Sequence, residues 1–581
     1  MTTERRVDSR GVSLSVREYG DDTAPTVVLV HGYPDTSRVW DEVVERLQGR
    51  YHIVTYDVRG AGDSSAPRGP RGYALERLAE DLAAVSDAVS PGRPVHVVGH
   101  DWGSIQSWEA VTTPAIAARI ASFTTISGPS FDHVKPWVRR RLRSGRFGEL
   151  ARQGVRSWYV WMFHGPLARL GMRHGFPRRF PEYLRRFERV QPREGHPAAT
   201  LGSDAGRGVA MYRTNLFPRA RASRDGRTDV PVQVIVPTRD AYVTPALLDD
   251  LDQFAPKLWR RRIGAQHWVP RTHPDVVARM VGEFVDHIEG APASRALRRA
   301  RSGAGRRLFE DQLVVVTGAG SGIGRATALA FAERGAEVVA ADIDPLAATR
   351  TAELAALLGP QAHPFEVDVS DREAMERFAK TVLHDLGVPD VIVNNAGIGL
   401  AGPFMDTEFD DWRRILDVNL WGVIHGSRLF GREMVERGEG GHIVNVASAA
   451  AFLPSRTLPA YSTSKAAVLM LSECLRAELA GAGIGVSAIC PGLINTSITR
   501  TSRFVGIDEA EQARRRRAAV RIYGLRNFTP ERVALAIVRS VRQNTAVVPV
   551  APEAHVLRGL SRLSPALIRK LARIDATPRR R

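Results

Sequence analysis

The chain of 581 residues has only two cysteines and no long uninterrupted apolar segment. Cys474 and Cys490 are too few for a disulfide framework, which favours a reducing compartment. No apolar run is long enough to span a bilayer or to form a secretory signal core. The sequence therefore predicts a cytoplasmic protein, with peripheral binding at the inner face of the cell membrane as an alternative location. No metal site is predicted.

Basic residues outnumber acidic ones, with 81 Lys and Arg against 63 Asp and Glu. Such an excess favours anionic partners, namely nucleic acid, a lipid surface or acidic substrates. The positive charge is spread over several segments without a recognisable nucleic-acid module, so nucleic acid is not a predicted partner. At the C-terminus leucines mix with arginines, and Pro565 is expected to break this segment into two short helices. We expect it either to lie on an anionic membrane surface or to pack on its own domain or a subunit partner.

Apolar β-branched runs alternate with helix-like segments in two separate series, which is typical of α/β folds with parallel sheets. These runs are 26–30, 51–56, 95–98, 122–126 and 232–236, then 313–317, 337–341, 391–394, 443–446 and 486–489. From about 130 to 230, Trp-, Arg- and Phe-rich sequence replaces the strand pattern and predicts a helical cap. We expect a capped domain over 1–290, a solvated basic linker over 291–308, a second domain over 309–550 and a basic amphipathic segment over 551–581.

The first series carries an aspartate where a sharp strand-to-helix turn usually carries a catalytic serine. Asp101 is the centre of Gly99-His100-Asp101-Trp102-Gly103, directly after the run 95–98. Small residues two positions before and after the centre allow the turn and project the central side chain. A carboxylate cannot act as an alkoxide, but it can attack an sp³ carbon and form an alkyl ester. This chemistry suits the opening of a strained ring or the expulsion of a halide.

Two further residues follow in the chain order nucleophile, acid, histidine. Asp240 comes after the run 232–236, and His267 follows it, so we expect Asp240 to orient His267 as a general base. The turn His31-Gly32-Tyr33-Pro34 is expected to aim the Tyr33 N–H at the reacting centre, with the Trp102 N–H as a second donor. Together these positions predict a complete hydrolytic site.

On these motifs the first half resembles the epoxide hydrolases of the α/β-hydrolase fold. The resemblance implies that two cap tyrosines bind the epoxide oxygen, and Tyr212 in 211–215 and Tyr159 before 163–166 match their motifs. It also implies that Asp101 opens the epoxide and that His267 activates water to release a vicinal diol. Haloalkane dehalogenases also use an aspartate and are the alternative. Tyr33 in the turn, where they usually carry asparagine, favours the epoxide.

The second series opens on a glycine-rich turn between a strand and a helix, Thr317-Gly318-Ala319-Gly320-Ser321-Gly322-Ile323-Gly324. Glycines let the backbone approach a pyrophosphate at the helix N-terminus, so this turn predicts a dinucleotide site. Asp342 follows the next strand, where a carboxylate binds the ribose 2′-hydroxyl and repels a 2′-phosphate. We therefore expect NAD as the cofactor, with NADP as the alternative because Arg325 lies beside the turn. The turn residues expected to bind it are Gly318, Ser321, Gly322, Ile323 and Gly324.

Tyr461 and Lys465 are four residues apart and are expected on one face of a helix. An ammonium group near a phenol lowers the pKa of the phenol. Tyr461 is therefore expected to exchange a proton with an alcohol or carbonyl oxygen near neutral pH.

With Ser448 upstream of this pair, the second half resembles the short-chain dehydrogenase/reductases. The resemblance implies that Ser448 positions the substrate oxygen, that Asn419 holds a proton-relay water and that Lys465 also binds the nicotinamide ribose. Like Lys465, Tyr461 is expected to contact the cofactor. A homo-oligomer formed through this domain is also implied. Further cofactor contacts are implied for Asp368, Val369, Asn395, Ala396, Gly397, Pro491, Gly492 and Thr496.

As a whole, the chain resembles the two-domain epoxide hydrolase–oxidoreductase proteins of actinobacteria and mycobacteria. A vicinal diol from the first site is a secondary alcohol that the second site could oxidise. We therefore expect a bifunctional enzyme that acts on a small-molecule or lipid epoxide and on an alcohol or ketone. In one alternative only the dehydrogenase half is active, and the hydrolase half is a lid or a docking module.

Overall fold

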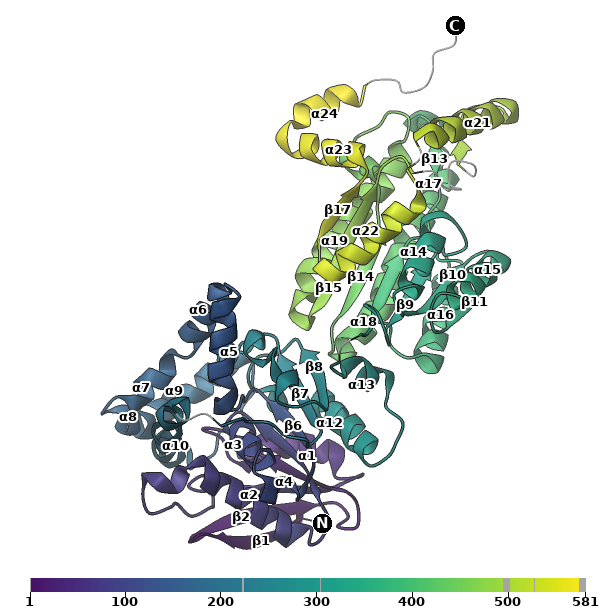
Figure 1. Cartoon of the computed structure of the whole chain (residues 1–581). Coiled ribbons are helices and arrows are strands. Elements are labelled where there is room, and N and C mark those ends of the chain that lie inside the picture. Colours follow the sequence, from purple (N-terminus) through teal and green to yellow (C-terminus); the bar gives the residue numbers. More distant parts are fainter. Residues whose placement is uncertain (1, 222–223, 304, 495–501, 527, 574–581) are drawn as a thin grey trace. The chain divides into compact units, whose positions relative to one another are not determined.

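The structure is a computed structural model that describes residues 2–221, 224–303, 305–494, 502–526 and 528–573 (Figure 1). Its contacts divide the chain into two compact units, Met1–Ala304 and Gly305–Arg581. Each unit is built on one sheet with helices on both faces, which confirms the predicted α/β class. Among the described helices, none is long and apolar enough to cross a membrane.

The first unit contains an eight-stranded sheet in the order β1-β2-β4-β3-β5-β6-β7-β8. Its strands are β1 (Thr2–Ser9), β2 (Val12–Tyr19), β3 (Thr26–Val30), β4 (His52–Tyr56), β5 (Val95–His100), β6 (Ile120–Ile126), β7 (Val232–Pro237) and β8 (Leu258–Ile263). Strand β2 pairs antiparallel with β1 and β4, and all other pairs are parallel. The five predicted strands are all present, whereas β1, β2 and β8 were not predicted.

Alternate residues of the central strands serve two separate cores. Val28 and Val30 of β3 face a core that includes α2 (Leu75–Val89) and α3 (Trp102–Val111). Val27 and Leu29 face a second core with α1 (Asp41–Leu47) and α12 (Pro274–Ile288). Because helices cover both faces, β3 is apolar along its length. The remaining helices outside the cap are α4 (Pro114–Ala117), α11 (Val269–Thr272) and α13 (Arg295–Ala300).

A helical cap is inserted between β6 and β7, as predicted. Its elements are α5 (Phe131–Arg143), α6 (Phe147–Arg156), α7 (Trp158–His164), α8 (Ala168–His174), α9 (Phe176–Tyr183), the π-helix η3 (Leu184–Glu188) and α10 (Leu201–Arg221). Helix α10 packs against α5, α7 and α8. This arrangement brings side chains from several cap helices over the carboxyl edge of the parallel strands, where the predicted catalytic residues lie.

The segment predicted as a solvated linker is partly ordered. Ser294 caps helix α13 by accepting a hydrogen bond from the Leu297 amide at 3.2 Å. Leu297 is fully buried in a small cluster with Trp259 and Phe284 of the first unit. The expectation of a solvated linker was wrong here because Leu297 and Ala300, three residues apart, form one apolar helix face.

The second unit contains a seven-stranded, fully parallel sheet in the order β11-β10-β9-β12-β14-β15-β17. Its strands are β9 (Leu313–Thr317), β10 (Glu337–Asp342), β11 (Ala362–Glu366), β12 (Val391–Asn394), β14 (Gly441–Val446), β15 (Ile484–Pro491) and β17 (Val547–Val550). The strand order reverses between β9 and β12, which is where ligands bind in open α/β sheets. This is the predicted doubly wound Rossmann-type arrangement.

Helices cover both faces of this sheet. They are α14 (Gly322–Ala332), α15 (Pro345–Ala356), α16 (Arg372–Asp385), α17 (Phe409–Leu416), the π-helix η7 (Asp417–Trp421), α18 (Gly422–Arg437), α19 (Pro459–Leu479) and α22 (Pro530–Gln543). Helix α21 (Glu509–Arg526) and the short strand pair β13 (Leu400–Ala401) and β16 (Arg503–Phe504) complete the unit.

The C-terminal segment forms two helices, α23 (Pro552–Leu563) and α24 (Pro565–Leu571), separated before Pro565 as predicted. Ala554 and Ile568 are buried, whereas Val556 and Leu563 are exposed. Helix α23 packs on β17 and on the short helix η8 (Ala449–Phe452). The segment therefore buries part of its apolar surface on its own unit.

Two candidate active sites

Asp101 lies at the strand-to-helix turn between β5 and α3 with φ 53° and ψ −121°. This conformation is unfavourable for a residue with a side chain and is found where the surrounding structure enforces it. A Cβ on Gly103 would collide with the Val30 carbonyl, and one on Gly99 would lie 2.7 Å from the Gly103 carbonyl carbon. The two small residues are therefore required by close backbone packing, as the motif predicted.

The structure brings the three predicted hydrolytic residues together. His267 Nδ1 lies 3.0 Å from Asp240 Oδ2, and His267 Nε2 lies 3.6 Å from Asp101 Oδ2. The second oxygen of Asp240 accepts the backbone N–H groups of Tyr242 and Val243 at 2.7 and 3.0 Å. Asp240 is thus held in place beside His267, and the other ring nitrogen of His267 faces the Asp101 carboxylate.

In the pair of His267 and Asp240, the attraction of opposite charges shifts the pKa values more than burial does. Burial would lower the pKa of His267, but Asp240 and Asp101 raise it well above its usual value. Burial would raise the pKa of Asp240, but His267 and the two backbone amides lower it. The imidazolium form is therefore stabilised when His267 takes a proton.

The predicted amide donor Tyr33 is in place. Its backbone N–H donates to Asp101 Oδ1 at 2.8 Å, whereas its phenol donates to the Ala205 carbonyl of α10 at 2.8 Å. Trp102 is the first residue of α3, and its ring packs against Tyr212 with centroids 4.8 Å apart. The backbone of Tyr33 is thus available to the nucleophile while its side chain holds the cap.

Two cap tyrosines face the nucleophile from different helices. Tyr159 on α7 and Tyr212 on α10 have ring centroids 6.0 Å apart. Burial raises the pKa of both phenols, and the Asp101 carboxylate raises them further. Both side chains therefore remain protonated hydrogen-bond donors at neutral pH.

Sequence reasoning missed a buried glutamate of the cap at this site. Glu188 in η3 accepts the backbone N–H of His267 at Oε2 (2.9 Å) and the Tyr183 phenol at Oε1 (3.2 Å). The Tyr183 and Tyr242 hydroxyls are 2.7 Å apart, which links this network to the loop of Asp240. Burial raises the pKa of Glu188. A lone glutamate in an arginine-rich segment carries no motif, so nothing in the sequence indicated it.

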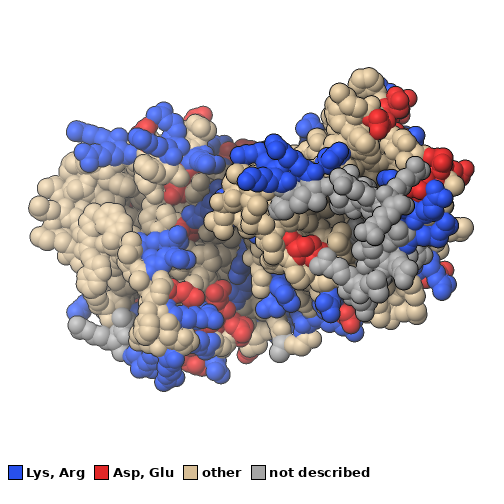
Figure 2. Space-filling view, turned by 90° about the horizontal axis from the view of Figure 1, so that it is seen from above, with Lys and Arg blue, Asp and Glu red and all other residues tan. Residues whose placement is uncertain are grey.

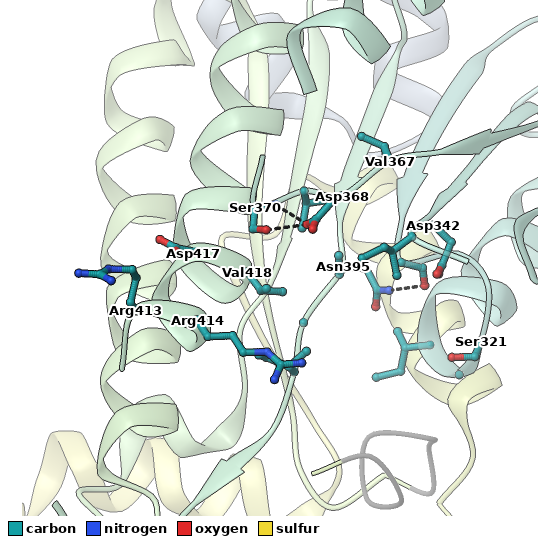
Figure 3. Close-up of a pocket in the computed structure, with 18 of the residues that line it drawn as sticks. Ser321, Asp342, Val367, Asp368, Ser370, Asn395, Arg413, Arg414, Asp417 and Val418 are labelled. Atoms are coloured by element: carbon teal, nitrogen blue, oxygen red, sulfur yellow. Dashed lines mark hydrogen bonds between the residues drawn. The ribbon is translucent and has the colours of Figure 1, made fainter. Parts of the chain in front are cut away.

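In the second unit a cavity of about 640 Å³ lies at the reversal of strand order (Figure 3). Ten predicted cofactor residues line it: Gly318, Ser321, Gly322, Ile323, Asp342, Asp368, Val369, Asn395, Ala396 and Gly397. Gly324, Tyr461, Lys465, Pro491 and Gly492 do not line it, and Thr496 lies outside the described residues. The lining residues that were not predicted include Arg414, whose side chain points into the cavity, and Arg413, which points away.

The glycine-rich turn forms a tight cradle at one wall of the cavity. Gly318 has φ +63°, and a Cβ there would lie 2.7 Å from Ala396 Cα. A Cβ on Gly324 would collide with the Gly318 carbonyl. Asn395 holds the turn by donating to that carbonyl at 3.0 Å. A cavity of this size beside a glycine cradle fits a nicotinamide dinucleotide.

Asp342 is held in position at the same cavity. Its Oδ2 accepts the Gly320 N–H at 2.7 Å, and its Oδ1 accepts the Asp344 N–H at 3.1 Å. Arg325 donates to the Gly320 carbonyl and to Thr351 Oγ1, so its guanidinium braces the turn from within the protein. Asp342 and Arg325 therefore both bond to Gly320 and hold the glycine-rich turn in place.

Tyr461 and Lys465 lie on α19, with the Lys465 Nζ 6.0 Å from the Tyr461 ring centroid. Burial raises the pKa of Tyr461, and a hydrogen bond with Ser448 opposes this rise. The prediction that Lys465 lowers the pKa of the Tyr461 phenol was wrong. The Lys465 Nζ donates to the Val446 carbonyl at 3.0 Å, and burial lowers the pKa of Lys465 to about 8. Ser448 is the group that acts on the phenol here.

Asn419 lies in the π-helix η7 and is fully buried. Its side chain accepts the Ile398 N–H at 2.8 Å and donates to the Ile398 carbonyl at 3.0 Å and to Ser464 Oγ at 3.2 Å. A Cβ on Gly397 would lie 3.1 Å from Asn419 Oδ1 and 3.4 Å from Lys465 Nζ. The three predicted positions therefore meet beside the cavity.

Pro491 ends β15, and Gly492 follows it against the C-terminal helix α23. A Cβ on Gly492 would collide with the Glu553 carboxylate, and Glu553 also accepts the Leu493 N–H at 2.7 Å. Helix α23 thus supports the segment that leads toward Thr496. The C-terminal helix was not predicted to take part in this site.

Comparisons with known proteins agree with this division. Residues 25–274 match the family model of the alpha/beta hydrolase fold, and residues 312–504 match that of the short chain dehydrogenases. The chain is 46% identical over 586 residues to "Probable oxidoreductase EphD" of Mycobacterium tuberculosis, with 98% of each chain covered. It is 35% identical to the C alpha-dehydrogenase of Sphingobium sp. over 46% of this chain and 90% of that protein.

Among solved structures, a short chain dehydrogenase/reductase from Burkholderia phymatum in complex with NAD is 30% identical, with a TM-score of 0.42. It covers 47% of this chain and 99% of that one. Since the likeness to the mycobacterial protein extends over both units, the chain belongs to the EphD family of oxidoreductases, in which an alpha/beta hydrolase domain precedes a short-chain dehydrogenase domain.

Proposed function

We propose that the chain is a bifunctional enzyme that hydrolyses a lipid-like epoxide to a vicinal diol and interconverts a secondary alcohol and a ketone with NAD or NADP. The observation that carries the first activity is the carboxylate of Asp101, which faces His267 on one side and lies close to the buried phenols of Tyr159 and Tyr212. When a carboxylate opens an epoxide, the leaving oxygen takes up a proton, and the two phenols are donors for it.

The first step opens the ring. Asp101 Oδ1 already accepts the Tyr33 N–H, so Oδ2 is the oxygen that attacks an epoxide carbon. The new C–O ester bond forms as the ring C–O bond breaks, and a proton from a cap phenol passes to the leaving oxygen. Because burial keeps both phenols protonated, this donor is present at neutral pH.

The second step releases the diol. His267, oriented by Asp240, takes a proton from water, and the resulting hydroxide attacks the ester carbonyl of Asp101. The Tyr33 N–H stabilises the charge on the carbonyl oxygen, as it does on Oδ1 in the free site. The acyl C–O bond breaks, and the diol leaves with the former carboxylate oxygen and the proton from His267. The proton that the hydroxide brings to Asp101 returns to the cap phenolate, which restores the free site.

At the second site, bound NAD or NADP supplies the hydride acceptor or donor. Tyr461 moves a proton to or from the substrate oxygen, and Ser448 hydrogen-bonds that oxygen and the phenol. Lys465 and Asn419 fix the polar surroundings of this group. A vicinal diol carries the secondary hydroxyl that such a site oxidises to a hydroxyketone.

A single-turnover reaction in ¹⁸O-labelled water tests the ester mechanism. With enzyme in excess over a long-chain epoxy fatty acid, the expected diol carries no label and the label enters Asp101. Labelled diol would mean direct attack by water and would overturn the mechanism. Turnover of a haloalkane but not of an epoxide would favour the dehalogenase alternative. With NAD added, a hydroxyketone is expected by mass spectrometry, and diol alone would detach the second site from this product.

A further inference from the structure

The exposed apolar side chains of the first unit gather on its cap. In the described part of that unit, every exposed large apolar side chain lies between residues 142 and 187. Val155 lies near the end of α6, three more lie on α7, and the last two lie on α8 or directly before it. We call this set the outer cap face: Val155, Trp158, Trp161, Met162, Leu167 and Leu170. Single exposed apolar residues are ordinary, but a contiguous group marks an interaction surface.

Helix α7 has one side that faces the site and another that faces the solvent. Tyr159 and Phe163 point inward, where the Phe163 ring packs on Tyr212 with centroids 4.6 Å apart. Trp158 and Trp161 point outward and are 63% and 69% exposed. A single helix therefore separates the outer cap face from the phenols above Asp101.

The same segment carries most of the excess charge of the chain. Residues 131–190 contain fifteen Lys and Arg against four Asp and Glu, an excess of eleven out of eighteen for the whole chain. Within the described residues, ten of these arginines form no ion pair with a carboxylate: Arg139, Arg143, Arg152, Arg156, Arg169, Arg173, Arg178, Arg179, Arg186 and Arg189. At the end of the first unit where the cap lies, Figure 2 shows a broad uncharged area flanked by groups of Lys and Arg.

Exposed apolar side chains beside arginines without an ion pair favour one kind of partner. A second copy of the cap would bring the same positive charge against the first, which opposes self-association. Nucleic acid would satisfy the arginines but would leave the exposed Val and Leu side chains in water. An anionic bilayer satisfies both, because tryptophans and aliphatic side chains enter the headgroup boundary while arginines meet the phosphates.

We propose that the outer cap face docks on an anionic lipid bilayer, with Trp158 and Trp161 at the level of the headgroups and the cap arginines on the lipid phosphates. Docking would place the cap, and the site beneath it, next to the source of an apolar substrate. That link to a lipid-like epoxide rests on the proposed function, whereas the docking itself does not depend on epoxide chemistry.

Co-sedimentation of the full chain with vesicles tests the docking. The protein is expected to bind vesicles that contain phosphatidylglycerol and to bind pure phosphatidylcholine vesicles weakly. Trp158→Ser with Trp161→Ser is expected to weaken binding at least about tenfold, because two indoles no longer enter the bilayer. Arg169→Gln and Arg173→Gln are each expected to weaken it roughly fivefold, and the effect disappears at high salt. The arginine variants keep the test valid if the tryptophan variant does not fold.

The matched control removes two exposed apolar side chains from the second unit, Leu346→Ser with Leu357→Ser, and is expected to bind like the wild type. Unchanged vesicle binding by both cap variants would overturn the proposal. Two other results would also overturn it. One is an equal loss of vesicle binding in the control, and the other is an oligomer in size-exclusion chromatography that only the tryptophan variant disrupts. Hydrolysis of a small soluble epoxide, measured on the same variants, is expected to stay unchanged. A failure of the docking proposal can therefore be distinguished from a failure of the proposed epoxide hydrolysis.

Discussion

The two units place their sites at the carboxyl edge of parallel strands but build them from different parts of the chain. In the first unit the site consists of side chains, Asp101, Asp240 and His267, from segments far apart in the sequence, closed by cap residues. In the second unit the backbone of a glycine cradle forms one wall of a cavity of about 640 Å³. The first site holds reactive groups close together, and the second leaves room for a large ligand.

This difference arises because the chain inserts different segments at the edge of each sheet where the site lies. The first sheet receives a long helical insertion between β6 and β7, and that cap contributes Tyr159, Tyr212 and Glu188. In the second unit only a short glycine-rich turn separates β9 from α14, and a cavity remains open at this edge. A cap supplies proton donors and excludes water, whereas an open edge admits a dinucleotide.

The sharpest test of the comparison removes one reactive group from each site. Asp101→Ala is expected to lower epoxide hydrolysis by about 10⁴-fold or more while leaving alcohol oxidation unchanged. Tyr461→Phe is expected to give the reverse pattern. Initial rates with a soluble epoxide and with a secondary alcohol plus NAD measure both. Wild-type epoxide opening by the Asp101 variant would remove the carboxylate nucleophile from the mechanism.

The cap donors give the next largest effect. Tyr159→Phe and Tyr212→Phe are each expected to lower kcat for epoxide opening roughly a hundredfold, since each removes one donor to the developing oxyanion. Neither change is expected to alter the KM for NAD. Rapid-quench measurement of the ester intermediate distinguishes the two steps, because a role in ring opening reduces its formation and not its decay. A slower decay would contradict the assigned role.

The Asp342→Ala substitution tests how the second unit selects its cofactor. Removing this carboxylate is expected to raise the KM for NAD and to improve the use of NADP relative to NAD by at least about tenfold, because a like charge no longer repels the 2′-phosphate. Asp344→Asn is the control, since its carboxylate caps α15 by accepting the Leu346 and Ala347 amides. If the cofactor preference of the Asp342 variant equals that of the wild type, Asp342 does not select the cofactor.

The central strands were predictable from sequence because both faces are buried and the apolar runs are continuous. The missed strands lack that signal for physical reasons. Most of β1 is exposed and polar, and β8 contains Arg260, Arg261 and Arg262 in succession. Arg261 is buried all the same, because Glu283 pairs with it at 2.6 Å. Such strands form where neighbours supply the pairing, which composition alone does not reveal.

The site residues divide in the same way. Asp101 and the glycine cradle were predictable because the backbone needs small residues at fixed spacing around them. Glu188 and Arg414 were not, since they reach their sites only through the packing of η3 and α17. The pKa of Tyr461 was mispredicted because the direction of the Lys465 side chain depends on the Val446 carbonyl, a contact that spacing does not specify.

The smallest expected effect concerns the buried Glu188 beside the catalytic histidine. His267 acts as a base only when neutral, and Asp240 and Asp101 raise its pKa above 6.5. The hydrolysis rate is therefore expected to rise with pH, with a midpoint above 6.5. Glu188→Gln keeps an oxygen acceptor for the His267 N–H but removes a negative charge near the imidazole. The imidazolium loses some stabilisation, so the midpoint is expected to shift to lower pH.

The rate of the Glu188→Gln variant at its optimum is expected to fall roughly fivefold or less, because one hydrogen bond is weakened and none is lost. Glu182→Gln is the matched control, since Glu182 is an exposed glutamate of the same cap segment that pairs only with Arg185 among the described residues. A pH profile of kcat, which includes the hydrolysis of the ester by His267, measures both variants. An unshifted midpoint with a lowered melting temperature would mean that Glu188 only holds the cap in place. A shifted midpoint at an unchanged melting temperature would mean that the cap sets the basicity of the histidine, a control that the open site of the second unit does not have.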